Sequence, residues 1–339
     1  MVLVCVIAFL IACLASIRSR SPVFIENRTE DSDAKMYRRV VQRLEAGEDY
    51  YQALGGELRK GHYYTGSVFN WRSPFHFAVI AAMTEPISRY VLAAAASAAI
   101  VMAALATERA GGLGVIQLVV TALAVSECFL FKLDYHLSAE VWSGVLILIS
   151  VTTYAFGRWR LGVISGILAL FFRELALPYI LVSAAISAWR KRKRELIWWS
   201  AGLGIWIAYY LTHVYFVSSR MTTADIAGPG WITFGGPRFL LATTKMSLLL
   251  AFADWVSAVL LPIMLVGIAG WAGGIGGRVA LVVAVYMAAF SIVGMPAVNF
   301  YWGAITNPLL AFGLVWSAPA LRDLLRALHR PRQMGASPR

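Results

Sequence analysis

The chain has 339 residues, of which 59% are hydrophobic and 14% are charged, and its formal net charge is +12. A soluble domain carries roughly a quarter charged residues, so this composition excludes an ordinary soluble protein. The basic residues gather in short loops and at the C-terminal end. That pattern favours membrane orientation and contact with anionic lipid, and it argues against nucleic acid as a partner.

Apolar stretches recur along the chain, and we expect an all-α, polytopic integral membrane protein with about ten membrane segments. These segments are 2–17, 89–106, 113–131, 137–156, 161–173, 175–189, 197–216, 254–271, 279–295 and 307–320. We expect one transmembrane domain, 1–320, followed by a basic cytoplasmic tail, 321–339. An even number of segments places both termini on the cytoplasmic side, as in a protein of the bacterial inner membrane. The short basic loops then also face the cytoplasm.

Residues 18–88 form the long polar region of the sequence and are predicted to be the first outer loop. Within it, 33–44 is predicted to be a surface helix, because its apolar residues recur at spacings of three and four and Gly47 follows. A second short helix is expected to begin at Pro74 and to end before Pro86. Such helices lie at the membrane surface and do not cross it.

Asp33 begins the first of these helices, and Tyr37 lies one turn later on the same face. A carboxylate at the membrane surface can act as a general base towards an acceptor hydroxyl. The alternative is a helix N-cap, a role in which Asp is common. Asp31, Ser32 and Asp33 also have the spacing of a metal-binding motif, but no further acidic partner is evident nearby. We therefore expect no metal and no other cofactor.

Arg72 stands in the run Asn70-Trp71-Arg72-Ser73-Pro74, where the outer loop returns to the membrane. One interpretation is an arginine that extends to the interface beside a tryptophan. The other is phosphate recognition by the guanidinium. Tyr301, in Asn299-Phe300-Tyr301-Trp302, is an aromatic on the same outer side. It can contribute to an interfacial aromatic belt or contact the substrate.

His136 and Glu140 are four residues apart and are expected to lie on one helical face, at the outer end of the segment 137–156. Glu140 has two interpretations. It can be a first-turn residue that the helix dipole favours, or it can form a polar wall of a substrate cavity together with His136.

Arg173 and Glu174 are the two charged residues between Arg160 and Arg190. The apolar arms on either side rise only about 18–22 Å as helices, which is short of a hydrocarbon core of about 30 Å. We therefore predict a pair of half-length helices that enters and leaves the membrane on the basic side, with the ion pair at its apex. The pair either joins the two helices or binds a phosphate.

These patterns together resemble the GT-C superfamily of membrane glycosyltransferases, which use polyprenyl-phosphate sugars. Five stretches carry the resemblance, in the order expected along the chain: Asp33-Ala34-Lys35-Met36-Tyr37, Trp71-Arg72-Ser73-Pro74-Phe75, Ser138-Ala139-Glu140, Phe172-Arg173-Glu174-Leu175-Ala176, and Tyr301-Trp302-Gly303 with Asn307-Pro308. An arginine often found near the last of these is missing, which leaves phosphate binding to Arg72, Arg173 and either Arg220 or Arg238. The chain is also short for the superfamily.

The resemblance implies an inverting transfer of a sugar from a polyprenyl-phosphate carrier to an acceptor glycan, lipid or protein at the outer face. It assigns Asp33 as the general base. The residues implied in substrate binding are Tyr37, Arg72, His136, Glu140, Arg173, Glu174 and Tyr301. Two other interpretations stay open: a transporter or flippase for a lipid-linked substrate, and a non-catalytic subunit of a membrane complex.

Overall fold

The computed structural model describes residues 2–18, 33–127, 134–228, 230, 232–251, 253–271, 273–294 and 299–329. Within these ranges the regular elements are α- and 3-10 helices, and one isolated antiparallel bridge joins Ile232 to Val293. The predicted all-α class is confirmed.

Three short helices at the polar end of the molecule share a small core of their own. They are α2 (Asp33–Glu45), α3 (Tyr50–Lys60) and α4 (Pro74–Met83). Each contributes a side chain with no exposed surface, namely Val40, Leu54 and Phe77. Gly47, at a φ of 84°, turns the chain between α2 and α3 and adopts a conformation that glycine accepts without strain.

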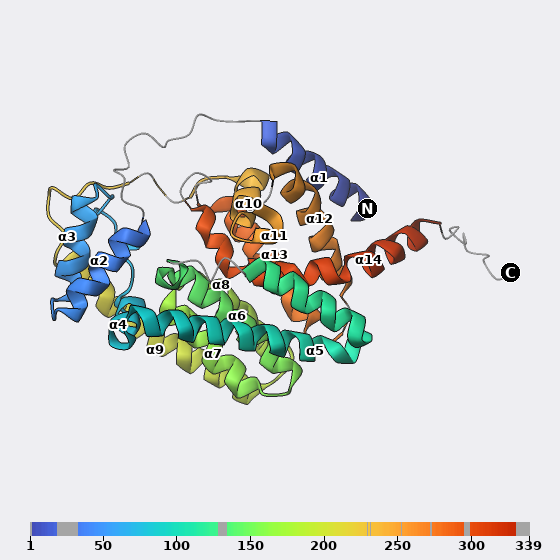
Figure 1. Cartoon of the computed structure of the whole chain (residues 1–339), viewed down its shortest axis with the longest axis horizontal. Helices are drawn as coiled ribbons and strands as arrows, with labels where there is room; N and C mark the ends of the chain where they lie inside the picture. The colour runs from blue at the N-terminus through green and yellow to red at the C-terminus, as the bar shows by residue number, and fades with distance from the viewer. Residues whose placement is uncertain are drawn as a thin grey trace.

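The middle of the chain forms long apolar helices. They are α5 (Glu85–Glu127), the 3-10 helix η3 (Tyr135–Leu137), α6 (Ala139–Ala155), α7 (Trp159–Phe172), the 3-10 helix η4 (Glu174–Ala176), α8 (Leu177–Trp189) and α9 (Lys193–Ser218). α5 contains one non-helical residue, Gly112, with a φ of 69°. There the helix turns and its second half runs back beside the bundle (Figure 1).

The C-terminal part adds α10 (Gly236–Thr244), α11 (Leu248–Ala251), α12 (Asp254–Gly270), α13 (Gly276–Ile292), the 3-10 helix η5 (Phe300–Ile305) and α14 (Asn307–His329). The N-terminal helix α1 (Val2–Arg18) packs against α10 and α12. α12 and α14 approach each other closely: a Cβ atom at Gly267 would lie 1.9 Å from the Gly313 carbonyl oxygen.

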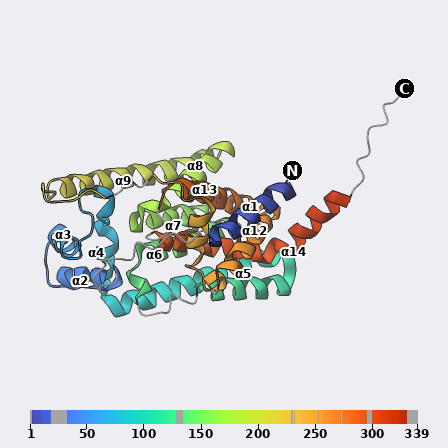
Figure 2. The ribbon, with the colours of Figure 1, turned by 90° about the horizontal axis from the view of Figure 1, so that it is seen from above.

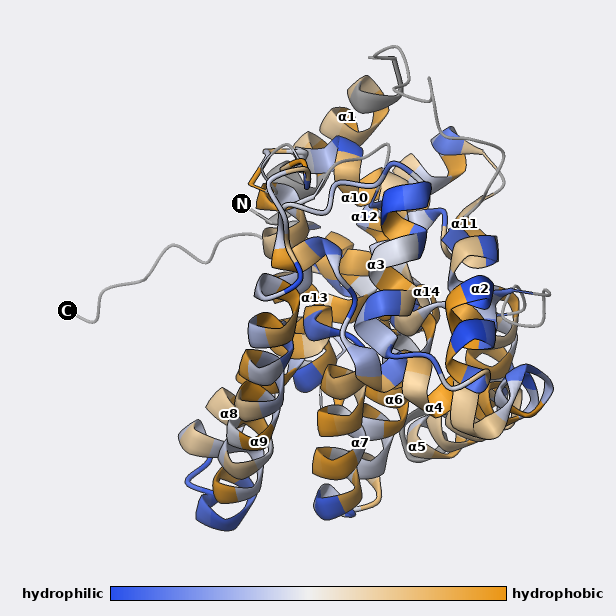
Figure 3. Ribbon diagram, turned by 90° about the vertical axis from the view of Figure 1, so that its left-hand side faces the viewer, coloured by the Kyte–Doolittle hydropathy of each residue, from blue (hydrophilic) through white to orange (hydrophobic). Residues whose placement is uncertain are grey.

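Most helices run along the long axis of the molecule (Figure 2). α5 lies along one edge, α8 and α9 lie along the opposite edge, and α6 and α7 lie between them. α2, α3 and α4 gather at one end. The arrangement therefore has a polar end and an apolar body. Figure 3 shows this contrast, with hydrophilic residues on α2 and apolar residues along α5, α7 and α8.

Two of the described helical segments, Glu85–Thr107 and Asn307–Ala327, are long and apolar enough to cross a membrane. Six further apolar helices in the described part have 10–17 residues. Apolar side chains also face outward: Ile197, Ile205 and Leu211 on α9 are 61–65% exposed. Exposed apolar surface of this extent marks an interaction with lipid or protein, and these features are consistent with membrane association.

The helices expected at 33–44 and from Pro74 are confirmed as α2 and α4. α3 was not predicted. Gly55 lies within it, and a Cβ at Gly55 would lie 2.6 Å from the Trp71 ring, so the glycine makes room for that ring. The segments 89–106 and 113–131 are joined in α5, and the end of the second lies outside the described residues.

The boundary predicted at 320 is not a helix end, because α14 continues to His329. Glu195 and Arg278, expected in the short loops 190–195 and 272–278, belong to α9 and α13 and are buried. They are 3% and 7% exposed, and Arg278 Nη2 lies 3.4 Å from Glu195 Oε1. A charged residue near a helix end can thus face a neighbouring helix, which the linear sequence does not reveal.

Candidate functional site

Arg72 projects from the turn that connects the polar end of the molecule to α4. Trp71 before it is 2% exposed and Pro74 after it lies in the first turn of α4, so the backbone is held on both sides. The guanidinium donates from Nε to the Tyr37 hydroxyl at 3.1 Å and from Nη2 to the Tyr301 hydroxyl at 2.8 Å. The side chain is 14% exposed, so it does not extend to solvent.

Glu140 lies between two arginines. Its Oε1 is 2.7 Å from Arg173 Nε and 3.8 Å from Arg72 Nη2, and Ser138 Oγ donates to its Oε2 at 3.1 Å. Arg173 Nη1 also contacts Glu174. Because an unpaired buried charge is strongly destabilising, these contacts explain how Glu140 and Arg173, each 2% exposed, are accommodated inside the helical body.

The predicted pair of short helices is present, and Arg173 is the point where α7 ends. Arg173 has an extended backbone, with φ −149° and ψ 121°. Such a break leaves backbone groups without helical partners. The Tyr286 hydroxyl of α13 donates to the Leu175 carbonyl at 2.9 Å, and the Ala176 N–H donates to the Arg173 carbonyl at 2.9 Å. These bonds compensate the break in apolar surroundings.

Asp33 is the first residue of α2, and Tyr37 lies one turn later. The Tyr63 hydroxyl donates to Asp33 Oδ1 at 2.5 Å. Burial raises the pKa of Tyr37 above its usual range, so this phenol is protonated at neutral pH. Since Tyr37 contacts Arg72, a single turn of α2 connects Asp33 to the arginines. We call the following residues the polar cluster: Tyr37, Arg72, Glu140, Arg173, Glu174 and Tyr301.

His136 belongs to a separate charged group, and the prediction that it shares a helical face with Glu140 is wrong. His136 lies in η3, and Ser138 between the two has an extended backbone, so helical spacing does not apply. His136 Nε2 is 3.3 Å from Glu85 Oε1. Arg38 Nη2 donates to the same oxygen at 2.8 Å. This group joins α2 to the start of α5.

His76 in α4 was not predicted as a site residue, although it lies between these two groups. It is 2% exposed and packs against the Phe77 and Phe172 rings at centroid distances of 4.9 and 6.1 Å. Burial lowers its pKa to about 3, and the charges of Glu140 and His136 also act on it. His76 is therefore neutral at physiological pH. A histidine in an apolar run has no sequence signal that marks such a position.

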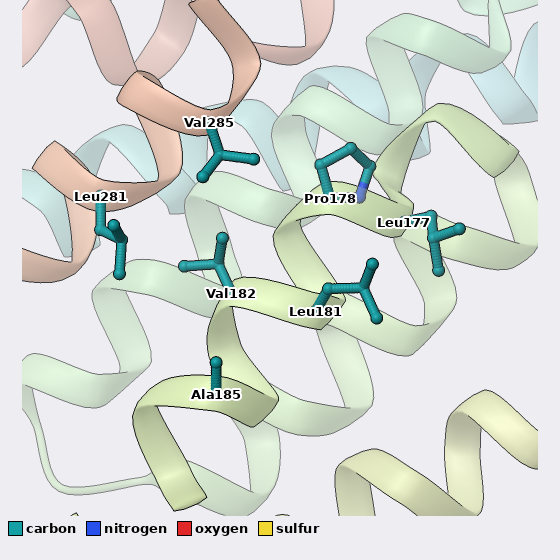
Figure 4. Close-up of a pocket in the computed structure, with 7 residues that line it drawn as sticks. All are labelled: Leu177, Pro178, Leu181, Val182, Ala185, Leu281 and Val285. Atoms are coloured by element: carbon teal, nitrogen blue, oxygen red, sulfur yellow. The ribbon is translucent and has the colours of Figure 1, made fainter. Parts of the chain in front are cut away.

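An apolar furrow lies next to the polar cluster, between α8 and α13, with a volume of about 480 Å³. Figure 4 shows its lining side chains, Leu177, Pro178, Leu181, Val182, Ala185, Leu281 and Val285. Leu177 directly follows η4, the short helix that Glu174 begins. From Leu177 to Ala185 the helix rises about 12 Å, so the furrow begins three residues after Glu174 and extends along the surface of α8.

The polar cluster and the furrow together suit a ligand with an anionic head and an apolar tail. Within the described residues, Nη1 of Arg72 and Nη2 of Arg173 make no hydrogen bond. Guanidinium groups bind phosphate through such terminal nitrogens. Arg220 is not part of the cluster: it contacts Asp49 at 3.2 Å and lies 4.9 Å above the Tyr51 ring, on the surface of α3.

Among the described residues, no group of three His, Cys, Asp or Glu side chains is arranged to hold a metal ion. Asp31 and Ser32, which completed the metal-like spacing with Asp33, lie outside the described residues. No protein-family model, no curated protein and no solved structure matches the chain. The interpretation of the site therefore depends on its own geometry and chemistry.

Proposed function

We propose that the chain is a polytopic inner-membrane protein of about ten segments, with both termini in the cytoplasm. The short helices α7 and α8 support this as a half-length pair that meets at Arg173 and returns to the basic side. A charged residue in the hydrocarbon region needs a polar partner, and Glu140 and Glu174 supply one. The polar end with α2 and α3 then faces outward.

We propose further that the protein transfers a sugar from a polyprenyl-phosphate carrier to an acceptor, with inversion at the anomeric carbon. The observation that carries this proposal is the polar cluster at one end of the apolar furrow. Its two arginines suit a phosphodiester and the furrow suits the first part of a prenyl chain. The carboxylate of Asp33 lies one helical turn from Tyr37, whose hydroxyl accepts a hydrogen bond from Arg72.

In the proposed reaction, Arg72 and Arg173 hold the carrier phosphate and stabilise the negative charge that grows on it as the glycosidic bond breaks. Such electrostatic stabilisation is commonly the largest contribution to catalysis. Glu140 and Glu174 orient Arg173. Asp33 takes the proton from the acceptor hydroxyl, whose oxygen attacks the anomeric carbon opposite the departing phosphate. Attack from that face requires inversion.

A non-catalytic subunit is the second candidate, and one feature favours it. The two carboxylates of Glu140 and Glu174 already balance the two positive charges of Arg72 and Arg173. The cluster can therefore hold α6, α7 and the turn before α4 together without any ligand. Such a protein would bind the lipid-linked carrier without consuming it. Transport of the same carrier across the bilayer would likewise give no product.

The test uses purified full-length protein with a panel of polyprenyl-phosphate sugars and measures release of the free carrier phosphate. Asp33→Asn should lower turnover by roughly 10²–10⁴-fold, the range for loss of a general base, while carrier binding persists. Glu45→Gln is the matched control, because it removes the same charge from an exposed position at the other end of α2.

Turnover by Asp33→Asn equal to that of the unmodified protein would exclude Asp33 as the base. Carrier binding without release of phosphate from any sugar of the panel would favour the non-catalytic candidate. Movement of labelled carrier across liposomes without product would favour transport.

A further inference from the structure

A basic surface lies at the end of the helical body opposite the polar cluster. It consists of two turns, and all of its basic side chains are exposed: Arg158, Arg160, Arg190, Lys191, Arg192, Lys193 and Arg194. The first turn precedes α7, whose other end is at Arg173, and the second follows α8, which runs back from that end. Arg160 and Arg173 are thus about 20 Å apart along α7. Figure 3 shows both hydrophilic turns at the bottom of the view.

Tryptophan rings join the two turns into one surface. The Trp159 and Trp198 rings meet edge to face, with centroids 5.9 Å apart. The Arg160 guanidinium lies 5.5 Å above the Trp159 ring. Trp189, at the end of α8, is 88% exposed. Exposed tryptophans beside arginine and lysine are typical of the headgroup region of a bilayer.

The one carboxylate in the second turn does not neutralise this surface. Glu195 is 3% exposed and points into the helical body, where Arg278 Nη2 lies 3.4 Å from Oε1 and the Tyr154 hydroxyl donates to Oε1 at 2.8 Å. Its one contact with the basic surface is Arg192 Nη1 at 3.4 Å from Oε2. Most of the positive charge is therefore available to a ligand.

Lys191 occupies a backbone position that normally belongs to glycine. Its φ is 54°. The Lys191 N–H donates to the Ala188 carbonyl at 3.0 Å, and the Arg192 N–H donates to the Ser187 carbonyl at 2.9 Å. This pair of bonds is the Schellman helix end, in which a left-handed glycine is preferred. A lysine here strains the backbone, yet it places an ammonium group at the tip of the turn.

We propose that the basic surface binds the phosphate headgroups of anionic phospholipids at the cytoplasmic face of the membrane. The ligand must combine anionic charge with a contiguous apolar part, because exposed Ile197 and Leu161, at 63% and 55% exposure, adjoin the charged turns. A nucleic acid offers no such apolar part, and an acidic soluble protein does not present a continuous apolar layer beside its charges. This inference depends on the membrane arrangement proposed above and is independent of the transferase activity.

The experiment uses the full-length protein in a neutral detergent, titrated with phosphatidylglycerol or with phosphatidylcholine of the same acyl chains. Native mass spectrometry counts retained lipids, and thermal unfolding gives the Tm. We expect preferential retention of phosphatidylglycerol. Each positive charge that is removed should lower the ratio of retained phosphatidylglycerol to retained phosphatidylcholine by about fivefold. Arg190→Gln with Arg194→Gln should therefore lose most of it.

Lys35→Gln with Lys60→Gln is the matched control, since it removes two exposed charges at the opposite end and should leave the preference unchanged. Lys191→Gly is the most diagnostic variant. It should preserve or raise the Tm without lipid, because glycine relieves the left-handed strain, and it should still weaken retention of phosphatidylglycerol.

Equal retention of the two lipids, or an equal rise in Tm with inorganic phosphate alone, would overturn the proposal. An unchanged lipid preference in Lys191→Gly and in the Arg190/Arg194 variant would do the same. If the protein transfers no sugar but keeps its preference for phosphatidylglycerol, only the proposed glycosyltransferase activity is contradicted. Failure to retain either lipid would refute the membrane arrangement together with the lipid site.

Discussion

At the residue scale, Asp225 joins the segment after α9 to the region of α3. Arg59 donates from Nε to Asp225 Oδ1 and from Nη2 to Oδ2, both at 2.9 Å, and the Thr65 hydroxyl donates to Oδ1 at 2.5 Å. The Asp225 side chain is 3% exposed. The hydrogen bonds from Arg59 hold the pKa of Asp225 well below its usual range. This single carboxylate attaches the loop after α9 to α3.

The depressed pKa predicts an acid-sensitive contact. Because the folded pKa of Asp225 lies below the unfolded value of about 3.9, the contact contributes its full stability above about pH 5 and loses it as the pH falls towards the folded pKa. Asp225→Asn should weaken the docking of the loop by about 1–3 kcal/mol at pH 7, with a smaller difference at pH 3. Hydrogen exchange of 222–226 measures this opening.

Asp323→Asn serves as the control for Asp225→Asn, because Asp323 is 76% exposed and, among the described residues, its ion-pair partner is Arg326. It should leave exchange at 222–226 unchanged at both pH values. The same exchange rates in Asp225→Asn and the unmodified protein at pH 7 would contradict the assigned role.

At the element scale, α12 and α14 pack backbone to backbone. A Cβ at Gly267 would lie 1.9 Å from the Gly313 oxygen, and one at Gly313 would lie 2.1 Å from the Met264 oxygen. Small residues permit such close approach between helices in a membrane, where van der Waals packing drives association.

Gly267→Ala should therefore separate α12 from α14 and destabilise the protein by about 1–3 kcal/mol, the usual cost of overpacking. Gly204→Ala in α9 is the control, because its Cβ would meet nothing within 4 Å, and alanine favours the helix by up to about 1 kcal/mol. Thermal unfolding in detergent should show a lower Tm for the first variant alone. Equal Tm values would mean that the helices are not in contact at Gly267.

At the scale of the whole molecule, the two ends differ in chemistry. The polar cluster and α2 stand at one end, and the basic surface stands at the other. A net excess of arginine and lysine marks cytoplasmic loops, so the difference predicts how the chain sits in the membrane.

Cysteine labelling in sealed vesicles tests that orientation. In a background with Cys5, Cys13 and Cys128 replaced by serine, Lys60→Cys and Lys193→Cys each introduce one thiol at an exposed position. An impermeant maleimide should label only Lys60→Cys from the outer side, and both after permeabilisation. Labelling of both from one side of intact vesicles would show that the proposed number or arrangement of crossings is wrong.

Several features could be predicted from the sequence because they depend on local patterns. α2 and α4 follow from helical periodicity and from Gly47 and Pro74. The break at Arg173 follows from two charges placed between apolar arms of insufficient length. By contrast, His136 contacts Glu85, which is far from it in the chain, so no local pattern predicts this pair. The extended backbone at Ser138 places His136 and Glu140 in separate helices, which their spacing of four residues does not reveal.

The amino-acid sequence by itself determined the all-α class, the helices α2 and α4 of the polar region and the short helix pair, since hydrophobicity and charge spacing act over a few turns. Only the tertiary structure decided that Tyr37, Arg72, Glu140, Arg173 and Tyr301 meet, that Glu195 and Arg278 are buried partners, and that Trp159 and Trp198 unite two basic turns. The physical reason is that these contacts arise from packing between helices, where the direction of each side chain depends on how its helix is rotated against neighbours that are distant in the sequence.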